Sequence, residues 1–496
     1  MDKDLIIQLQ QQQLIEQQKL IGMLKELHVL KDESLIDRDK LIGEQGKMIL
    51  MLEARVTELE NNQKKNSSNS SKPPSSDIGK PKQTKSLRTS SGKKPGGQTG
   101  HAGETLSFST TPDEIITHAV SQCSCCGKNL SGVDARDREC RQVYDIPPIK
   151  IIITEHQSEI KSCPKCNATT KAAFPTGVNS SFQYGTRVQA FAAYLTQQQL
   201  LPYARTAQIF QDIFGHPISQ SFLVNNNKRF AKKLEPFIKE LKEKLLQQPV
   251  LHADETGYYY KGERNWLHTL CTKTHTLYMP HEERGKQAMD GMGILPNYKG
   301  TVVHDFWKPY NTFACRHALC NVHHLRDLTF CEEVLKCSWA AKMKQFLLKY
   351  YQKVKAEKES GATSLTKGQL KYVFKIYNEL INEGRELYPP PEKVKGKRGA
   401  AKKNKSHNLL ERFYNFKYSV LAFLIDFAIP FGNNDAEQAI RMMKVKQKVS
   451  GCFRSEQGAK DFATIRSYIA TMHKQGYSIF EAMETAISGN PIKLLA

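Results

Sequence analysis

The stretch PVLHADETGYYY at residues 249–260 decides the fold of this chain, because it has the pattern of a buried strand that ends on acids. Its apolar start leads directly to Asp254, with Glu255 next. A second β-branched stretch, TVVHDFWKPY at residues 301–310, delivers Asp305. An acid just after a buried strand is costly unless it binds metal, makes hydrogen bonds or faces water. Two such strands in one domain predict a shared cation site, and ordinary turn residues are the alternative.

Two more short strands are expected between these stretches, WLHTLCT at 266–272 and HTLYMP at 275–280. Three strands in succession suggest a meander, and RGKQAMDGMGILP at 284–296 has the pattern of a helix. This mixture predicts a domain of α/β class that begins near residue 249.

A third acid lies far along the chain, in PFGNNDAEQAIRMMKVKQKVSG at residues 430–451. The Pro and Gly at its start break the preceding pattern, and the Asn-Asn-Asp run is expected to cap a new helix. Glu437 then lies in the first turns, with Arg441 four residues later and Lys444 seven residues later. One helix face therefore carries a carboxylate and two cations. The alternative is an exposed helix with an ion pair worth about 0.2–0.5 kcal/mol.

The composition restricts the class of protein. The chain has 496 residues, of which 39% are apolar, so collagen, a wholly disordered polymer and a small disulfide scaffold are excluded. Lys and Arg number 72 against 50 Asp and Glu, and the net charge of +22 favours a nucleic-acid partner, although a basic protein without one is the alternative. We expect no membrane span, because no run of apolar residues is long enough. The acidic, Gln-rich start lacks the pattern of a signal peptide, and 12 cysteines in a long chain without such a signal predict a cytoplasmic protein with reduced thiols.

Cysteine pairs bracket a β-rich stretch within residues 104–182. Cys123 and Cys126 form one pair and Cys163 and Cys166 the other, each with two residues between the thiols. This spacing lets two sulfurs reach one ion from a tight turn, and two such turns complete a tetrahedral site. Because thiolates are soft ligands, we predict a structural Zn²⁺ site; buried free cysteines or a redox pair are the alternatives.

The N-terminal part divides into a helix and a linker. Residues 1–62 contain no Pro and keep apolar heptad spacing in two registers that do not join, which favours a slipped coiled coil over a solitary amphipathic helix. The second register is carried by Ile42, Ile49, Leu52, Val56 and Leu59. Residues 63–103 are rich in Ser, Lys, Gly and Pro and predict a disordered basic linker. Lys93 and Lys94 in this linker are candidates for DNA phosphate contacts, and a merely soluble linker is the alternative.

Residues 183–248 predict a helical region in which Gly-His-Pro at 215–217 separates two apolar-periodic stretches. Ser219 is expected to cap the second helix. A helix, a short turn and a helix in a basic protein suggest a helix-turn-helix, although any two-helix hairpin has this pattern. The groove-facing candidates on the second helix are Asn225, Asn226, Lys228 and Arg229.

Three of these segments together resemble the transposases of the insertion sequence 66 family. They are HADETG at 252–257, VVHDFWKPY at 302–310 and NNDAEQAIRMMKVKQKVSGCFRSEQGA at 433–459. The basic stretch KKPGGQTGHAG at 93–103, the cysteine pairs and LPYARTAQIFQDIFGHPIS at 201–219 follow the same order of parts. The resemblance extends over nearly the whole chain.

The resemblance implies a multidomain α/β protein whose catalytic domain, residues 249–450, has a ribonuclease-H-like fold. In that fold the first and fourth strands of a mixed sheet carry two Asp residues, and a later helix carries the Glu. A helical insertion is expected at about 330–410, together with the basic run EKVKGKRGAAKKNK at 392–405. Residues 451–496 would form a C-terminal helical region.

The family's Asp-Asp-Glu roles fall on Asp254, Asp305 and Glu437. Such a triad would hold two Mg²⁺ ions for cleavage and strand transfer at the ends of a mobile element. Lys444 matches the cation that related transposases place seven residues after the Glu, and with Arg441 it would hold phosphates. The implied partners are terminal-repeat DNA, target DNA, further copies of this chain and accessory proteins of the same element.

A Cys-x-x-His pair, Cys320 and His323, follows the second Asp in ALCNVHHLRDL at 318–328. Many Asp-Asp-Glu transposases carry a similar segment, and we expect structural support of the site from it. A packed core helix and a second metal site are the alternatives. Two other functions are also open: a ribonuclease-H-like nuclease that only hydrolyses, and an inactive transposase-derived DNA-binding protein. The predicted DNA-binding parts argue against the first, and the intact acids argue against the second.

Overall fold

The computed structural model describes residues 12–20, 23, 35–66, 69, 106–389 and 405–495. The chain divides into two compact units. One comprises Met1–Thr84, Ala173–Gln208 and Ile218–Ala496, and the other comprises Lys85–Ala172 and Ile209–Pro217. Among the described helices, none combines the length and the apolar character that a membrane crossing needs.

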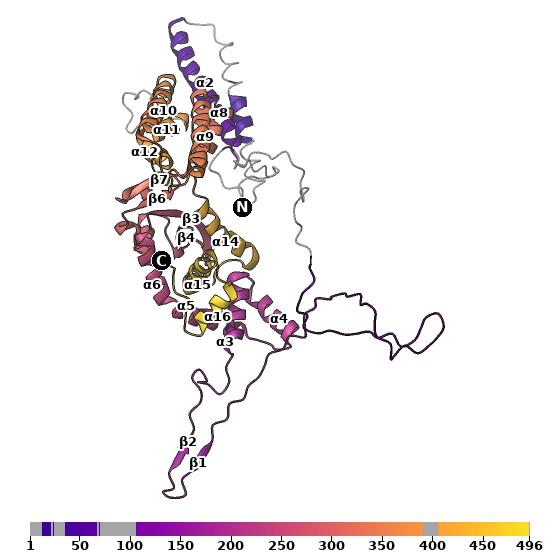
Figure 1. Ribbon diagram of the computed structural model, residues 1–496. Coiled ribbons are helices and arrows are strands. Elements are labelled where there is room, and N and C mark those ends of the chain that lie inside the picture. Colours follow the sequence, from indigo (N-terminus) through magenta and orange to yellow (C-terminus); the bar gives the residue numbers. More distant parts are fainter. Residues whose placement is uncertain are drawn as a thin grey trace. The chain divides into compact units, whose positions relative to one another are not determined.

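A five-stranded mixed sheet forms the centre of the larger unit (Figure 1). Its strands are β3 (Val250–Tyr260), β4 (Glu263–Cys271), β5 (Thr276–His281), β6 (Thr301–His304) and β7 (Arg316–Leu319), in the spatial order β5-β4-β3-β6-β7. The first three strands form the expected antiparallel meander, while β6 and β7 run parallel to β3 and to each other. The two acid-bearing strands, first and fourth in sequence, are therefore neighbours at the centre of the sheet.

Local chemistry explains the tight hairpin between β3 and β4. Its two turn residues, Lys261 and Gly262, both have positive φ, 49° and 81°. A two-residue loop with this conformation matches the right-handed twist of the strands on either side. The return to the parallel strand β6 runs through α7 (Lys286–Met292) and the short helix η3 (Leu295–Asn297), as a parallel crossover requires.

Helices from both ends of the larger unit share one core with the sheet. They are α3 (Thr186–Ala193), α5 (Gln220–Lys233), α6 (Glu235–Gln247), α15 (Glu456–Lys474) and α16 (Ile479–Ile487). Leu241 of α6, Leu251 of β3 and Tyr468 of α15 are fully buried in this core. The divisions expected after residues 248 and 450 therefore do not separate packing units, because apolar faces on both sides of each division cover the same sheet.

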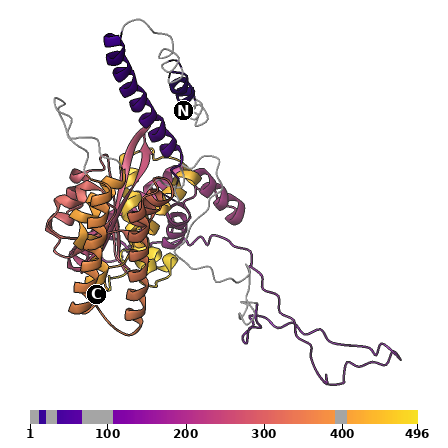
Figure 2. The same cartoon turned by 90° about the horizontal axis from the view of Figure 1, so that it is seen from above.

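A second core lies in the helices between β7 and α14 (Asn434–Ser450), which carry orange colours in Figures 1 and 2. These helices are α8 (Asn321–Glu333), α9 (Ser338–Glu359), α10 (Lys367–Leu387), α11 (Lys405–Asn415), α12 (Lys417–Val420) and α13 (Ala422–Ile425). Trp339, Tyr377 and Phe413 fill the core without measurable exposure. The helical part thus runs from 321 to 425, wider than the expected 330–410, and all but the last residue of the basic run at 392–405 lies outside the described residues.

The predicted break between two helices at residues 215–217 is present between α4 (Tyr203–Phe214) and α5. Gly215 adopts a positive φ of 63°, and the Ser219 hydroxyl accepts a hydrogen bond from the Phe222 amide, 3.0 Å away. The N-cap predicted at Ser219 is therefore confirmed. The chain before α4 contains one turn of π-helix, η2 (Tyr194–Gln198).

The N-terminal helix α2 spans Leu35–Gln63. Along it, Ile49, Leu52, Val56 and Leu59 are half-buried, whereas Leu50 and Met51 are each 68% exposed. The slip between the two heptad registers falls at residues that lie outside those described. The coiled coil consequently remains a prediction.

Candidate active site

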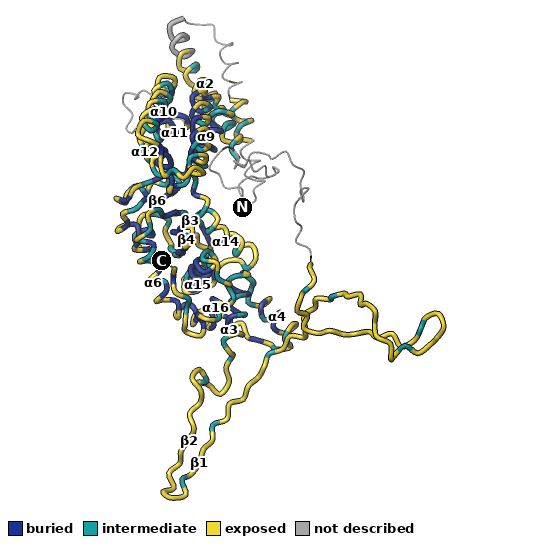
Figure 3. Tube along the Cα trace, viewed as in Figure 1, coloured by how far each residue is buried: buried dark blue, intermediate teal, exposed yellow. Residues whose placement is uncertain are grey.

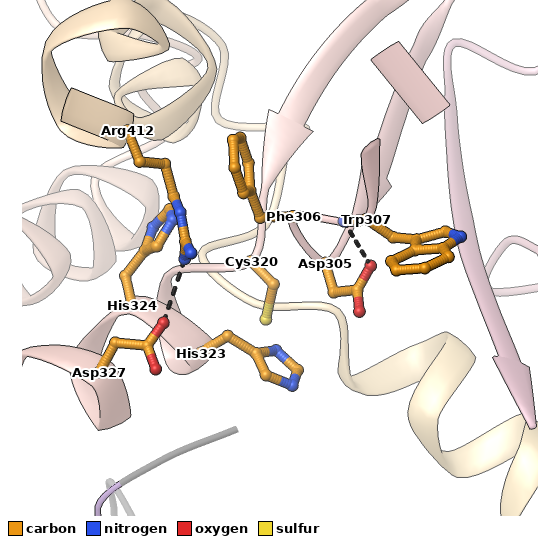
Figure 4. A pocket seen from close by; sticks show the side chains of 8 residues that line it. All are labelled: Asp305, Phe306, Trp307, Cys320, His323, His324, Asp327 and Arg412. Atoms are coloured by element: carbon orange, nitrogen blue, oxygen red, sulfur yellow. Dashed lines mark hydrogen bonds and ion pairs between the residues drawn. The ribbon is translucent and has the colours of Figure 1, made fainter. Parts of the chain in front are cut away.

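The parallel pairing of β3 and β6 brings the first two predicted acids to neighbouring positions, Asp254 within β3 and Asp305 just after β6. His252 is paired with Val303, and continuing this register by two residues sets Asp254 beside Asp305. Asp305 immediately follows the end of β6, and its Oδ1 accepts a hydrogen bond from the Trp307 amide, 3.0 Å away (Figure 4). Both carboxylates therefore occupy positions that the backbone fixes.

The third predicted acid, Glu437, joins the first two through α14. This helix packs against β3, and Glu437 lies in its first turn. Burial raises the pKa of Asp254 well above its ordinary value, and Glu255, Asp305 and Glu437 raise it further. Burial, with a contribution from Glu255, raises the pKa of Asp305 to about 6. Burial also raises the pKa of Glu437, which Arg326 and Arg441 partly oppose.

These shifts show that the three acids act on one another electrostatically in a poorly solvated place. Negative charges gathered in this way are unfavourable until a cation compensates them. One oxygen, Oε1 of Glu437, is buried and has no hydrogen-bond partner among the described residues. Hard carboxylate oxygens are the ligands that Mg²⁺ prefers, so the donor set fits that ion.

The Cys-x-x-His segment lies beside Glu437, and Figure 4 shows its two side chains, Cys320 and His323, near Asp305. The ligand atoms of Cys320, His323 and Glu437 are all within 4.8 Å of one another. His323 Nδ1 lies 3.8 Å from Glu437 Oε1, and burial lowers the pKa of His323 to about 4, so the ring is neutral at neutral pH. Burial raises the pKa of the Cys320 thiol to about 12, so this sulfur is protonated. A neutral imidazole and a thiol are consistent with the expected supporting role.

Asn433 connects three elements of the site, a role that sequence reasoning missed because the residue was considered only as a helix cap. Its amide N–H donates to Cys320 Sγ, 3.2 Å away, and its Nδ2 donates to the Ala253 carbonyl, 2.7 Å away. Its Oδ1 lies 2.9 Å from His252 Nδ1. The residue is 2% exposed. It thereby ties the start of the Glu437 helix to the strand position directly before Asp254.

Gly432 permits this close approach of the Cys-x-x-His segment to the start of α14. A Cβ at this position would lie 2.7 Å from Cγ2 of Val322, well inside van der Waals contact. The backbone amide of Asn321 also donates to the Phe431 carbonyl at 2.9 Å. The start of α8 and the start of α14 are therefore held together by packing and by hydrogen bonds.

Glu255 anchors a second network that the sequence did not reveal. Its buried carboxylate accepts bonds from Arg284 Nε and Nη2, at 2.8 and 2.7 Å, and from Tyr310 Oη, at 2.8 Å. The Arg284 guanidinium also lies over the Trp307 ring, 4.1 Å from its centroid, and over Trp266 at 4.9 Å. This ion pair and its contacts hold Trp307 and Tyr310, which follow Asp305 in the chain.

The two cations predicted on the Glu437 helix have different surroundings. Lys444 Nζ donates to the Gly257 carbonyl of β3, 2.7 Å away, so it pins α14 to the strand that carries Asp254. Arg441 is exposed and close enough to Glu437 to lower its pKa. Phosphate binding by either residue remains a prediction.

A pocket of about 200 Å³ opens at the site, as the close view in Figure 4 shows. Its lining comprises Asp305, Phe306, Trp307, Cys320, His323, His324, Asp327 and Arg412. Arg412 Nη1 donates to Asp327 Oδ2 across 3.1 Å. The helical insertion thus contributes one wall, through α8 and α11, while the sheet contributes the other.

The residues predicted to contact DNA outside the site differ in their exposure. Asn226 was predicted to read base edges, which is wrong for this structure: it is 1% exposed, and its Nδ2 donates to the Gln189 carbonyl at 2.9 Å. The reason is that the inner face of α5 is buried in the sheet core. Asn225 is exposed on the outer face of the same helix. Lys93 and Lys94 lie outside the described residues.

The first cysteine pair of the smaller unit forms a tight turn. The Cys123 amide donates to the Lys128 carbonyl at 2.9 Å, and the Gly127 amide donates to the Cys123 carbonyl at 3.0 Å. Gly127 has a φ of 70°, which closes the turn. The backbone amide of Cys126 lowers the pKa of the Cys123 thiol, which favours the thiolate.

The second cysteine pair repeats the two backbone hydrogen bonds of this turn. The Cys163 amide donates to the Ala168 carbonyl at 2.9 Å, and the Asn167 amide donates to the Cys163 carbonyl at 2.8 Å. Asn167 has the positive φ here, 56°. The backbone amide of Lys165 lowers the pKa of the Cys163 thiol. Each turn presents two sulfurs as a metal knuckle does, but among the described residues the four sulfurs are not gathered within 4.8 Å of one another.

Comparison with protein families identifies two of these regions. A family model described as "Transposase IS66 family" matches residues 181–461, and one described as "zinc-finger binding domain of transposase IS66" matches residues 121–167. A "Family of unknown function (DUF6444)" matches residues 12–107. No curated protein matches the chain. The zinc-finger match at 121–167 spans both cysteine pairs and supports Zn²⁺ as the metal of those residues.

Proposed function

This chain belongs to the IS66 family of transposases, and on that premise we propose that it cleaves DNA at the ends of a mobile element and joins the freed ends to target DNA. The observation that carries the proposal is the convergence of Asp254, Asp305 and Glu437. They come from two adjacent strands and a distant helix, and their pKa values are all raised by burial. Buried acids with raised pKa values that lie close together are typical of a catalytic metal site.

The strand order supports a ribonuclease-H-like fold for the catalytic part. Three antiparallel strands followed by two parallel ones, with acids on the first and fourth, is the arrangement that the family resemblance implies. The Glu comes from α14, after a helical insertion. The pairing of β3 with β6, which makes the two acid-bearing strands neighbours, is consistent with this fold.

Asp254, Asp305 and Glu437 are the residues that would hold Mg²⁺, and the unpartnered Oε1 of Glu437 fits such a ligand. When bound, two Mg²⁺ ions would supply activation of the attacking oxygen and stabilisation of the leaving 3′ oxygen. The chain's own residues position these acids: Asn433 and Lys444 tie α14 to β3. Arg441, exposed beside Glu437, is available for a phosphate of the substrate.

The proposed reaction has two steps. Water first attacks the phosphodiester at the element end, which breaks the bond to the 3′ oxygen and frees a 3′-hydroxyl. That hydroxyl then attacks a target phosphodiester and displaces its 3′ oxygen, so the number of phosphodiester bonds is conserved. The site needs no cofactor beyond the metal for either step.

Recognition and pairing of the ends would rest on the other parts. We propose that Cys123, Cys126, Cys163 and Cys166 hold one Zn²⁺, and that this module with the exposed face of α5 recognises terminal-repeat DNA. The linker at 63–103 would contact phosphates through Lys93 and Lys94. A coiled coil of residues 1–62 would pair two chains, one at each end, in the cytoplasm of a cell.

The test is a strand-transfer assay with labelled duplexes that carry the element's terminal repeats, an unlabelled target plasmid and Mg²⁺. We expect cleavage at the repeat boundary, a free 3′-hydroxyl and label joined to the plasmid. Nicked ends without joined product would instead indicate a nuclease. Bound but uncut ends would indicate a DNA-binding protein without catalysis.

A further inference from the structure

A second and larger pocket, of about 470 Å³, lies on the opposite side of α14 from Glu437. On this helix Asp435, Gln438 and Met442 face the pocket, whereas Glu437, Arg441 and Lys444 follow the other face at the same helical spacing. The remaining walls come from α15, β5 and η2. The catalytic site described above uses none of its cationic groups.

Arg466 of α15 is the most unusual group in this pocket. Its Nη1 donates to the Gln197 carbonyl at 3.2 Å and also to the Gln198 Oε1, while its Nε is buried without an acceptor. Within the described part of the chain, no carboxylate forms an ion pair with this guanidinium. A buried guanidinium without a counter-charge is unfavourable, and it is strongly stabilised by any anion that reaches it.

Two ammonium groups and an imidazole enter the same pocket. Lys474 Nζ donates to the Thr272 carbonyl, 2.6 Å away, and Lys273 is exposed at the rim with His473. The single acid in the lining is Asp435, whose Oδ2 lies 3.5 Å from His252 Nε2. Three formal cations therefore face one carboxylate.

The chemistry of this lining fits a phosphate group. A guanidinium gives planar, directed donors, and two ammonium groups give point charges, which is the usual set for phosphate oxygens. We propose that the pocket binds a backbone phosphate of the DNA through Arg466, Lys273 and Lys474, and so anchors the duplex on the far side of α14 from the reacting phosphate. This inference rests on the proposed function for its source of phosphate.

The pocket also touches the catalytic geometry through two residues. Asp435 lies two positions before Glu437 on α14, and its partner His252 is bonded to Asn433, which holds the backbone beside Asp254. An anion in the pocket would therefore act electrostatically on Asp435, which lies in the helix turn that carries the third acid. The anchor site and the catalytic site share α14 and β3.

Thermal unfolding in inorganic phosphate tests the pocket without DNA or Mg²⁺. A ligand that binds only the folded protein raises the Tm. Compared with chloride at equal ionic strength, phosphate should raise the Tm of wild type and of Lys371→Gln, a control that removes the same charge from α10. Lys273→Gln and Arg466→Gln should lose the rise. Lys273 is exposed, so its variant stays informative even if Arg466→Gln does not fold.

DNA binding, measured by fluorescence anisotropy over a range of salt without Mg²⁺, tests the source of the phosphate. Lys273→Gln should weaken binding on the order of tenfold and reduce the slope of log K against log salt by about 0.9, equally for terminal-repeat and unrelated duplexes. Bound DNA should also abolish the phosphate-dependent rise in Tm.

Three results would overturn the proposal. They are no phosphate effect in wild type, an unchanged slope in Lys273→Gln, and a phosphate effect that persists with DNA bound, which would make the pocket a site for a small free anion. A wild type that binds no DNA at all would defeat the proposed function. The phosphate effect would still report on the pocket separately, because it is measured without DNA.

Discussion

The sheet with its helices and the cysteine-bearing stretch at 106–172 bury apolar side chains very differently, as the colours of Figure 3 show. Leu251 and Val302 in the sheet are at most 1% exposed, whereas Val143, Ile152 and Ile153 in the stretch are 81–91% exposed. The sheet is stabilised by its own apolar packing. The stretch has turns, a hairpin of two three-residue strands and a few longer-range hydrogen bonds such as those between Ser109 and Gln142, so we expect metal ligation to hold its parts together.

Loss of the triad acids should have the largest effect and should leave both regions folded. We expect Asp254→Asn, Asp305→Asn and Glu437→Gln each to lower cleavage and joining by roughly 10³-fold or more, because ligands of one metal pair act as a unit. Binding to terminal-repeat DNA should change little, since other parts supply it. Asp290→Asn, which removes a half-buried acid of α7 that pairs with Lys286, is the matched control. Near-normal joining by any triad variant would remove that residue from the site.

Removal of one cysteine thiolate should unfold the cysteine-bearing stretch and leave the sheet folded. Cys163→Ser should abolish zinc binding and expose residues 106–172 to protease, while the sheet keeps its tryptophan fluorescence. Cys140→Ser changes an exposed cysteine outside both turns and should retain the metal. Zinc content per chain and limited proteolysis measure both effects. A full complement of zinc in Cys163→Ser would place the ligands elsewhere.

Asn433→Ala should impair the active site through geometry. Its side chain makes two hydrogen bonds, to His252 and Ala253, that hold α14 against the strand before Asp254, and a misplacement of about 1 Å lowers catalysis on the order of 10²-fold. We expect kcat for cleavage to fall while the KM for DNA stays within a few-fold. The exposed neighbour offers a control, Asn434→Ala. Equal loss in both variants would show that the buried contacts are not the cause.

The pH dependence of stability should give the smallest effect. The pKa of Asp305 is about 6 in the folded protein, above the ~3.9 of an unfolded chain, so the folded state binds more protons between those values. Stability without Mg²⁺ should therefore fall as pH rises through this window, and cleavage with Mg²⁺ should rise. Asp305→Asn should be more stable than wild type at pH 7 by roughly 1–3 kcal/mol.

Denaturant unfolding at pH 4.5 and 7, followed by tryptophan fluorescence, measures this difference. Trp266 and Trp307 stack on Arg284 near the site, so they report on the sheet. Asp290→Asn should follow wild type at both pH values, since it retains the Asp305 carboxylate. A stability of Asp305→Asn that follows wild type at both pH values would contradict the burial argument.

Several features of the site could be predicted because short-range chemistry sets them. A β-branched run that ends on an acid predicted the end of β6 just before Asp305, and the Cys-x-x-Cys spacing predicted two similar turns. Ser219 acts as a helix cap through a bond to a residue three positions away. Each of these depends on neighbours along the chain, which a sequence displays directly. The strand end expected at Asp254 was wrong, because β3 continues to Tyr260 through its pairing with β4.

The features that the sequence did not predict depend instead on contacts between residues far apart in the chain. Asn226 and Asn225 are adjacent and chemically identical, and only the packing of α5 on the sheet core decides that one is buried and the other exposed. Asn433 was expected only as a cap, because its partners Ala253 and Cys320 lie 180 and 113 residues away. A side chain's distant partners leave no periodic pattern in the sequence.

The sequence by itself therefore determined the class of domain, the three candidate carboxylates, the cysteine knuckles and the family. Tertiary structure alone decided which strands are neighbours, that helices before and after the sheet share one core with it, and that opposite faces of α14 carry Glu437 and line the second pocket. The physical reason is that propensity and spacing act over a few residues, whereas parallel pairing, buried hydrogen bonds and an uncompensated Arg466 arise only when distant segments exclude water together.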